Sequence, residues 1–145
     1  MILTEILVAC IWKEIKKEEY IFIPFSKLEG GLMVCQSKFY KTSNDSYKLG
    51  EMFKKCIEDH KHTPFIEKNF PTFYEVTGIK SNNKRQKNYS LVIADFYTVD
   101  NVYRLTPCKK SEGNFLGTYD IEPIPKNATS EEIGELIKKT FEMSD

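Results

Sequence analysis

Apolar runs rich in β-branched and aromatic residues dominate the chain and predict a structure built mainly of strands. The longest run, residues 89–99, has a composition typical of strands, and residues 101–107 continue it across a short turn. We expect both segments at the centre of a sheet. A last strand is expected at residues 115–124, after a polar turn.

The N-terminal part of the chain has the pattern of a hairpin followed by one more short strand. Residues 16–19 form a charged turn between the apolar stretch 3–15 and the strand-like segment 20–25. A hairpin is the simplest interpretation, although the first arm could instead be a short helix. A diglycine turn precedes a further expected strand at residues 32–36.

Two segments carry apolar residues at helical spacing directly after polar cap residues. We expect one helix from about Ser46 to Asp59, after the cap cluster 42–46, and a final helix capped by residues 127–132. Each helix has one apolar face. These faces comprise Leu49, Met52, Phe53, Cys56 and Ile57 in the first helix, and Ile133, Leu136, Ile137 and Phe141 in the second.

The two helical segments echo each other. Residues 49–58 match residues 133–142 position by position, at an offset of 84. The echo predicts two strand-then-helix units that pack equivalent faces onto one sheet; chance similarity between lysine-rich amphipathic helices is the alternative. Because a glycine inside a helix costs about 1 kcal/mol relative to alanine, Gly50 and Gly134 need a packing reason, and we expect a close helix approach near the first turn.

These elements predict a single α+β domain over residues 1–145, a mainly antiparallel sheet with two amphipathic helices packed on it. The chain is 41% hydrophobic and 29% charged, which argues against disorder. Lys+Arg and Asp+Glu both number 21, so no global field favours nucleic acid or a membrane surface. Arg85 and Arg104 are the only arginines, which argues against a site for bidentate phosphate recognition.

The cysteines and the N-terminal segment point to the cytoplasm. None of Cys10, Cys35, Cys56 and Cys108 forms a CxxC pair, so we expect buried free thiols rather than a zinc site or disulfides. The first segment contains Glu5 within a short apolar run and resembles neither a signal peptide nor a membrane span, so it is expected to be a core element.

Motifs that would carry catalysis are absent from the sequence. It contains no phosphate-binding glycine loop, no HExxH and no GxSxG, and we expect no metal and no cofactor. His60 and His62 follow the first expected helix, where a cationic group suits the helix dipole, and we interpret them as an exposed feature of that helix end.

Asp95 lies inside the longest strand and has three possible roles. Strand alternation places it on one face with Leu91, Ile93 and Tyr97. It could be an ordinary exposed carboxylate, it could contact a partner on a half-exposed sheet surface, or it could be a catalytic acid with a raised pKa.

The C-terminal pattern resembles the closing segment of cytosolic immunity proteins from bacterial contact-dependent growth inhibition systems. The resemblance rests on a strand ending in residues 121–125, followed by a polar cap, an acidic pair and an apolar-glycine entry into the last helix, within about the last 25 residues. It implies that the chain binds the toxic C-terminal domain of an effector, commonly a nuclease, as a monomer in the complex, and blocks its active site or substrate surface.

An inhibitor of a nuclease needs acidic groups that complement a basic cleft, and tyrosines are enriched at interfaces. From position and chemistry, we expect the partner to contact Asp95, Tyr97, Asp100, Tyr119, Asp120 and Glu122. One alternative is an adaptor or structural subunit that self-associates through an exposed apolar patch. Another is an enzyme, for which a pocket joining Asp95 to His60 or His62 would be the sign.

Overall fold

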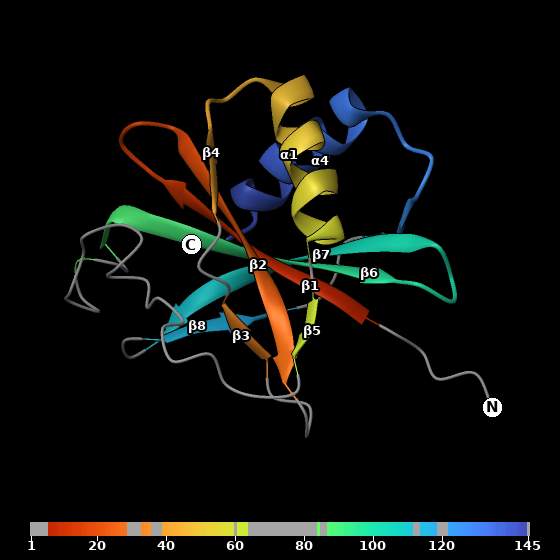
Figure 1. Ribbon diagram of the computed structural model, residues 1–145. Helices are drawn as coiled ribbons and strands as arrows, with labels where there is room; N and C mark the ends of the chain where they lie inside the picture. The colour runs from red at the N-terminus through yellow and green to blue at the C-terminus, as the bar shows by residue number, and fades with distance from the viewer. Residues whose placement is uncertain are drawn as a thin grey trace.

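The computed structural model describes residues 6–28, 33–35, 39–59, 61–63, 84, 87–111, 114–118 and 122–144. Within these ranges the chain forms two helices over a nine-stranded, mostly antiparallel sheet, which confirms the predicted α+β class (Figure 1). The helices are α1 (Ser46–Glu58) and α4 (Ser130–Glu142). The strands are β1 (Ile6–Glu14), β2 (Glu19–Leu28), β3 (Met33–Cys35), β4 (Tyr40–Thr42), β5 (Lys61–Thr63), β6 (Tyr89–Tyr97), β7 (Val102–Ser111), β8 (Asn114–Gly117) and β9 (Ile124–Pro125).

Two hairpins form the middle of the sheet. The main strand order is β3-β2-β1-β6-β7-β8, and β1 and β6 pair antiparallel along their whole length. The first arm is therefore a strand rather than a helix, and the predicted hairpin is confirmed. The prediction that residues 89–99 and 101–107 form central strands is also confirmed, because β6 and β7 pair with each other inside this order.

Both helices cover the same face of the sheet and enclose the main core (Figure 1). Their apolar faces meet the inward residues of the central strands, such as Ile11, Val92 and Leu105, all of which are fully buried. A second apolar cluster lies on the opposite face of the sheet, around Cys10, Trp12 and Leu91. The alternation predicted for the longest strand is confirmed, because Val92, Ala94 and Phe96 belong to the main core whereas Leu91 and Ile93 belong to or pack against the second cluster.

The helices cross at their two glycines. A Cβ atom added to Gly50 would lie 1.8 Å from the carbonyl oxygen of Ser130, and one added to Gly134 would lie 1.8 Å from the carbonyl oxygen of Ser46. Each glycine of the echo thus allows the backbone of the other helix to approach. The predicted close helix approach is confirmed: at the two glycines, the helices approach each other.

The two halves of the fold repeat each other. In each half a hairpin (β1–β2 or β6–β7) adds a short strand (β4 or β9) to its second arm before a helix begins. Both hairpin turns span four residues and end on a residue with positive φ, Glu18 at 53° and Asn101 at 54°. The helix N-caps, Asp45 and Thr129, are again 84 residues apart. Within the described residues β5, which pairs parallel to β2, has no counterpart in the second half.

Residues 115–124 do not form the single strand expected from the sequence. The pairing of Cys108 with Gly117 would place Glu122 opposite Tyr103, but Ile124 lies there instead, so the second strand of the pair contains two extra residues. A regular ladder cannot contain two unmatched residues, and Pro123 lacks the amide hydrogen that a ladder needs. The segment is therefore divided into β8 and β9.

Within the described part of the chain, neither helix is long and apolar enough to cross a membrane.

Candidate functional site

Asp95 and Tyr97 lie on the sheet face that points away from the helices. Both are partly exposed, and Asp95 stands between Val8 on β1 and Arg104 on β7 in the strand register. The guanidinium carbon of Arg104 lies 5.1 Å from the centroid of the Tyr97 ring, which is a cation–π geometry. Opposite charges directly across two strands favour each other. The surface around Asp95 thus combines an acid, a cation and an aromatic ring on rigid central strands.

The other candidate acids lie elsewhere. Asp100 is exposed in the turn between β6 and β7, and β9 runs beside that turn, where the amide of Lys126 donates to the carbonyl of Asn101 at 3.1 Å. Glu122 is exposed just before β9. Tyr119 and Asp120 lie outside the described residues. The candidates with a described position therefore divide between the sheet face around Asp95 and the edge of the molecule around β9.

A hollow of about 360 Å³ lies beside α4, and Glu122 is on its rim. Its apolar wall is formed by residues of β9, of α4 and of the C-cap of α4, among them Ile124, Leu136 and Met143. Glu132 and Lys139 add one charge of each sign. We call this hollow, with these residues as its lining, the α4 groove.

Sequence reasoning missed the α4 groove, apart from Glu122. The offset of 84 contained the signal, because it also relates positions outside the two matched helices. Applied to the residues that directly follow the matched helices, it pairs Asp59 with Met143. A carboxylate in one half and a thioether in the other indicate that the two halves fill this space differently.

Groups with a shifted pKa belong to the core and do not form an acid–base site. Burial raises the pKa of Tyr20 to about 12, with the Glu18 carboxylate adding to the rise, and burial likewise raises the pKa of Tyr89 and of Tyr103. Burial also raises the pKa of Cys108 to about 11. A general acid or base works best with a pKa near the operating pH, and these shifts lead away from it.

The cysteines and histidines form no common site in the described part of the chain. Cys10, Cys56 and Cys108 are buried free thiols, whereas the side chain of Cys35 lies outside the described residues. No group of metal-ligating side chains occurs among the described residues. His60 also lies outside them, but Lys61–Thr63 form β5 on β2, so His62 belongs to a strand and not to an exposed end of α1.

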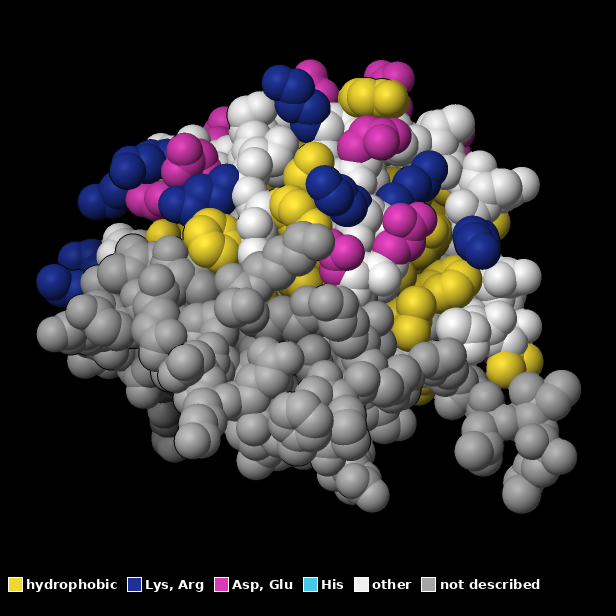
Figure 2. Space-filling model, viewed as in Figure 1, with side chains coloured by type: hydrophobic (Ala, Val, Ile, Leu, Met, Phe, Trp, Pro, Cys, Tyr) yellow, Lys and Arg dark blue, Asp and Glu magenta, His cyan; other side chains and the backbone are white. Residues whose placement is uncertain are grey.

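The charges on the helical side of the molecule are mixed. Figure 2 shows Lys and Arg side chains interspersed with Asp and Glu over the coloured part of this face, with apolar side chains between them. Around the α4 groove, however, Glu122, Glu131, Glu132 and Glu135 are all exposed. Acidic side chains therefore outnumber basic ones along that rim, where Lys139 is the one cation lining the described hollow.

Two solved structures share this fold over nearly the whole chain. No protein-family model and no curated protein matches the sequence. A Neisseria meningitidis protein of unknown function, NMB0488, aligns with a TM-score of 0.75 at 12% identity, over 100% of this chain and 99% of that chain. A chain of the CdiA-CT/CdiI toxin and immunity complex from Yersinia pseudotuberculosis aligns with a TM-score of 0.71 at 12% identity, over 97% of this chain and 98% of that chain. At this identity the similarity establishes a shared fold.

Proposed function

We propose that this chain is an immunity protein that binds and neutralises the toxic C-terminal domain of a contact-dependent growth inhibition effector in the cytoplasm. The observation that carries the proposal is the similarity to a chain of a toxin and immunity complex over 97% of this chain. The resemblance of the last 25 or so residues to such proteins leads independently to the same proposal. The toxin is a protein partner, and no cofactor takes part.

A contact surface with acidic side chains suits inhibition of a nuclease. A nuclease cleft is basic because it holds a polyanion, so an inhibitor gains speed and specificity from preorganised acidic groups. Our proposed contact surface is Asp95, Tyr97, Asp100, Tyr119, Asp120 and Glu122. Of these, Asp95 and Tyr97 stand on central strands, which hold their backbone in place before the partner arrives.

Co-expression with the product of the open reading frame immediately upstream tests the proposal. We expect that product to arrest growth when expressed alone and to become harmless in a stoichiometric complex with this chain. Expression of this chain alone is the control and should leave growth unaffected. If this chain were itself toxic, or if no complex formed and the upstream product were harmless, the immunity function would be refuted.

Substitutions at the proposed surface then test where the toxin binds. We expect Asp95→Asn and Asp100→Asn each to weaken the complex by more than about 1 kcal/mol, roughly fivefold in Kd, as residues at the centre of an interface do. Glu18→Gln is the matched control, because it removes an exposed charge from the equivalent turn of the other hairpin. Equal and small effects of the substitutions at Asp95, Asp100 and Glu18 would show that the toxin binds another surface, and the proposed immunity function would not be affected.

A further inference from the structure

The two halves of the molecule treat the space beside their helices differently. In the first half, Tyr40 on β4 fills the space beside α1: its hydroxyl donates to the carboxylate of Asp59, and the ammonium of Lys55 lies 4.9 Å from the centroid of its ring. Tyr40 also packs against the main core. One aromatic ring of the chain itself therefore closes the space beside α1.

Among the described residues, no ring fills the same space in the second half. In the strand register Ile124 pairs with Tyr103 as Thr42 pairs with Tyr20, so Glu122, two residues before Ile124, takes the place of Tyr40. At the helical offset of 84, Lys139 takes the place of Lys55 and Met143 that of Asp59. Glu122 is exposed and carries a carboxylate instead of a ring, whereas Ile124 is only 3% exposed and belongs to the main core. The three substituted positions all line the α4 groove. The groove is therefore the space that an aromatic side chain occupies in the other half.

The walls of the α4 groove suit an aromatic side chain. Its volume of about 360 Å³ is at the lower end of the range for ligand pockets, which fits one large side chain better than an extended ligand. Leu136 and Met143 offer an aliphatic chain and a thioether, and sulfur–aromatic contacts are favourable. Lys139 is the counterpart of the lysine that lies over the Tyr40 ring.

The charged residues at the rim of the α4 groove restrict which residues can flank the aromatic side chain that binds there. Glu122 and Glu132 line the groove, and Glu131 and Glu135 lie next to it on the exposed face of α4. Acidic neighbours attract a cationic segment and repel an acidic one. The ring should therefore come from a segment that also carries Lys or Arg.

We propose that the α4 groove is a docking site for an aromatic side chain of a partner protein, presented between basic residues, which takes the position that Tyr40 occupies in the other half. The identification of the partner as the toxin domain rests on the proposed function. The preference of the groove for an aromatic ring between basic residues does not depend on that function.

The first test needs no toxin. We would titrate the full chain, labelled at isoleucine, leucine and methionine methyl groups, with a capped lysine–tryptophan–lysine tripeptide and follow the methyl resonances by NMR. We expect saturable binding in the millimolar range, with ring-current shifts at Ile124, Leu136 and Met143. Lysine–leucine–lysine and glutamate–tryptophan–glutamate peptides should bind at least threefold more weakly. Equal shifts with the leucine peptide, or no shift at these methyl groups with tryptophan, would overturn the proposal.

Two variants make the test specific. Lys139→Gln removes the cation and should weaken the tryptophan peptide about two- to fivefold. Its control, Lys138→Gln, changes the neighbouring lysine, which pairs with Glu135 on the same helix and does not line the groove. The double change Glu122→Tyr with Met143→Asp transplants the Tyr40–Asp59 pair and should abolish binding by filling the groove. If this double variant does not fold, the comparison of Lys139→Gln with Lys138→Gln still tests the proposal.

The complex with the toxin separates the two proposals. If the toxin binds and the Leu136 and Met143 methyl groups shift, the groove is part of the interface and both stand. If the toxin binds without affecting these methyl groups, the groove proposal fails and the immunity function remains. If the tripeptide binds but no toxin does, the immunity function fails while the aromatic specificity of the groove stands.

Discussion

At the scale of single residues, the packing of the two helices depends on the lack of a side chain at Gly50 and Gly134. The added Cβ atoms would meet backbone atoms of the other helix, which cannot rotate away as a flexible side chain can. Only a shift of a whole helix would relieve such a contact. The sequence places the two glycines at equivalent positions, and the structure shows that each faces the serine that begins the other helix.

Replacing Gly134 by alanine should therefore destabilise the protein, although alanine is the better helix former. Helix propensity favours the change by about 1 kcal/mol, whereas overpacking against a rigid neighbour costs about 1–3 kcal/mol and sometimes more. Because the added Cβ would lie only 1.8 Å from a backbone oxygen, the cost should reach the upper end of this range, and we expect a net loss of about 2 kcal/mol in the free energy of unfolding, measured by urea denaturation. Gly117→Ala is the control, because its Cβ would meet a threonine methyl group at 3.2 Å and should cost less than about 1 kcal/mol. A Gly134→Ala protein that is as stable as the parent would show that the helices do not meet here.

Alkaline pH should destabilise the fold through its buried tyrosines. Tyr20 is fully buried, its hydroxyl donates to Asn44 at 3.0 Å, and its pKa is raised from 10.0 to about 12. Since the unfolded chain loses this proton first, the stabilisation is complete below pH 10 and is lost as pH rises from about 10 to about 12. Urea titrations across this window should show a falling free energy of unfolding, with a shallower slope in Tyr20→Phe. An identical slope in both proteins would contradict the role of Tyr20.

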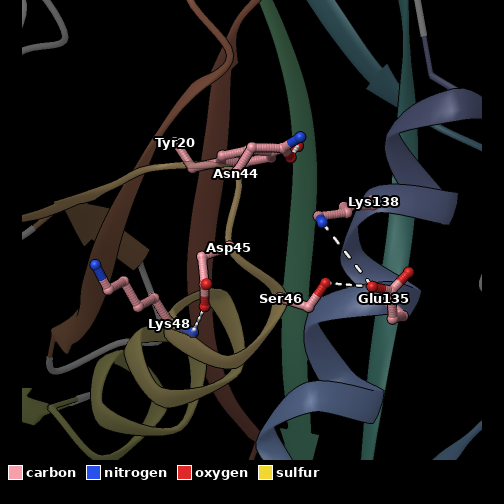
Figure 3. A network of polar contacts seen from close by, with 7 residues as sticks. All are labelled: Tyr20, Asn44, Asp45, Ser46, Lys48, Glu135 and Lys138. Atoms are coloured by element: carbon pink, nitrogen blue, oxygen red, sulfur yellow. Dashed lines mark hydrogen bonds and ion pairs between the residues drawn. The ribbon is translucent and has the colours of Figure 1, made fainter.

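At the scale of elements, the two helix N-termini are bound to each other reciprocally. The Ser46 hydroxyl donates to a carboxylate oxygen of Glu135, and the Ser130 hydroxyl donates to a carboxylate oxygen of Glu51 at 2.5 Å. Figure 3 shows the first of these bonds, together with Lys138, which pairs with the same glutamate, and with the Asp45 cap on the amide of Lys48. The two serines are 84 residues apart, and so are the two glutamates. The two hydrogen bonds between the helices are therefore equivalent.

Removing the buried Ser130 hydroxyl should lower the free energy of unfolding more than removing the partly exposed Ser46 hydroxyl. Ser130 is 6% exposed, whereas Ser46 is partly exposed and water can replace its bond. A hydrogen bond to a charged group contributes about 1.5–3 kcal/mol, so we expect Ser130→Ala to lose about 2 kcal/mol and Ser46→Ala less than about 1 kcal/mol. A double-mutant cycle of Ser130→Ala with Glu51→Gln, measured by urea denaturation, should give a coupling above about 0.5 kcal/mol. Additive effects would mean that the two side chains act independently.

At the scale of the whole molecule, two similar halves close one core. Strand β1 pairs with β6 across the middle of the sheet, and α1 packs on α4 above it. Each half alone would expose the edge of its central strand and one side of its helix. Such a half has too little core of its own, because the fraction of surface that folding buries falls as the chain becomes shorter.

Expressing residues 1–83 and 84–145 as separate chains should therefore give two poorly folded halves that assemble into a folded heterodimer. Circular dichroism should show cooperative unfolding for the mixture and none for either half. Introducing Gly134→Ala into the second half should weaken assembly at least tenfold, which converts to about 1.4 kcal/mol. Cooperative unfolding of either half by itself would show that its core is sufficient.

The candidate site could be predicted only in part from the sequence. Alternation along β6 correctly placed Asp95 and Tyr97 on one face, because successive side chains of a strand point to opposite sides. It could not show that Arg104 lies beside them, since cross-strand neighbours depend on register. The contact surface itself stays a prediction, with Tyr119 and Asp120 outside the described residues.

Sequence by itself determined the strand-like segments 20–25, 89–99 and 101–107, both helices with their caps, and the pair of glycines, because period, propensity and capping are local properties of the chain. It left open whether the first hairpin arm is a strand or a helix, and the pairing of β1 with β2 and β6 decided for the strand. Tertiary structure alone decided which backbone each glycine faces, where residues 115–124 break into β8 and β9, and that the space beside α4 is open while Tyr40 fills its equivalent beside α1. These features depend on contacts between residues far apart in the sequence. A local pattern specifies which face of an element is buried, and the rest of the fold determines what lies against that face.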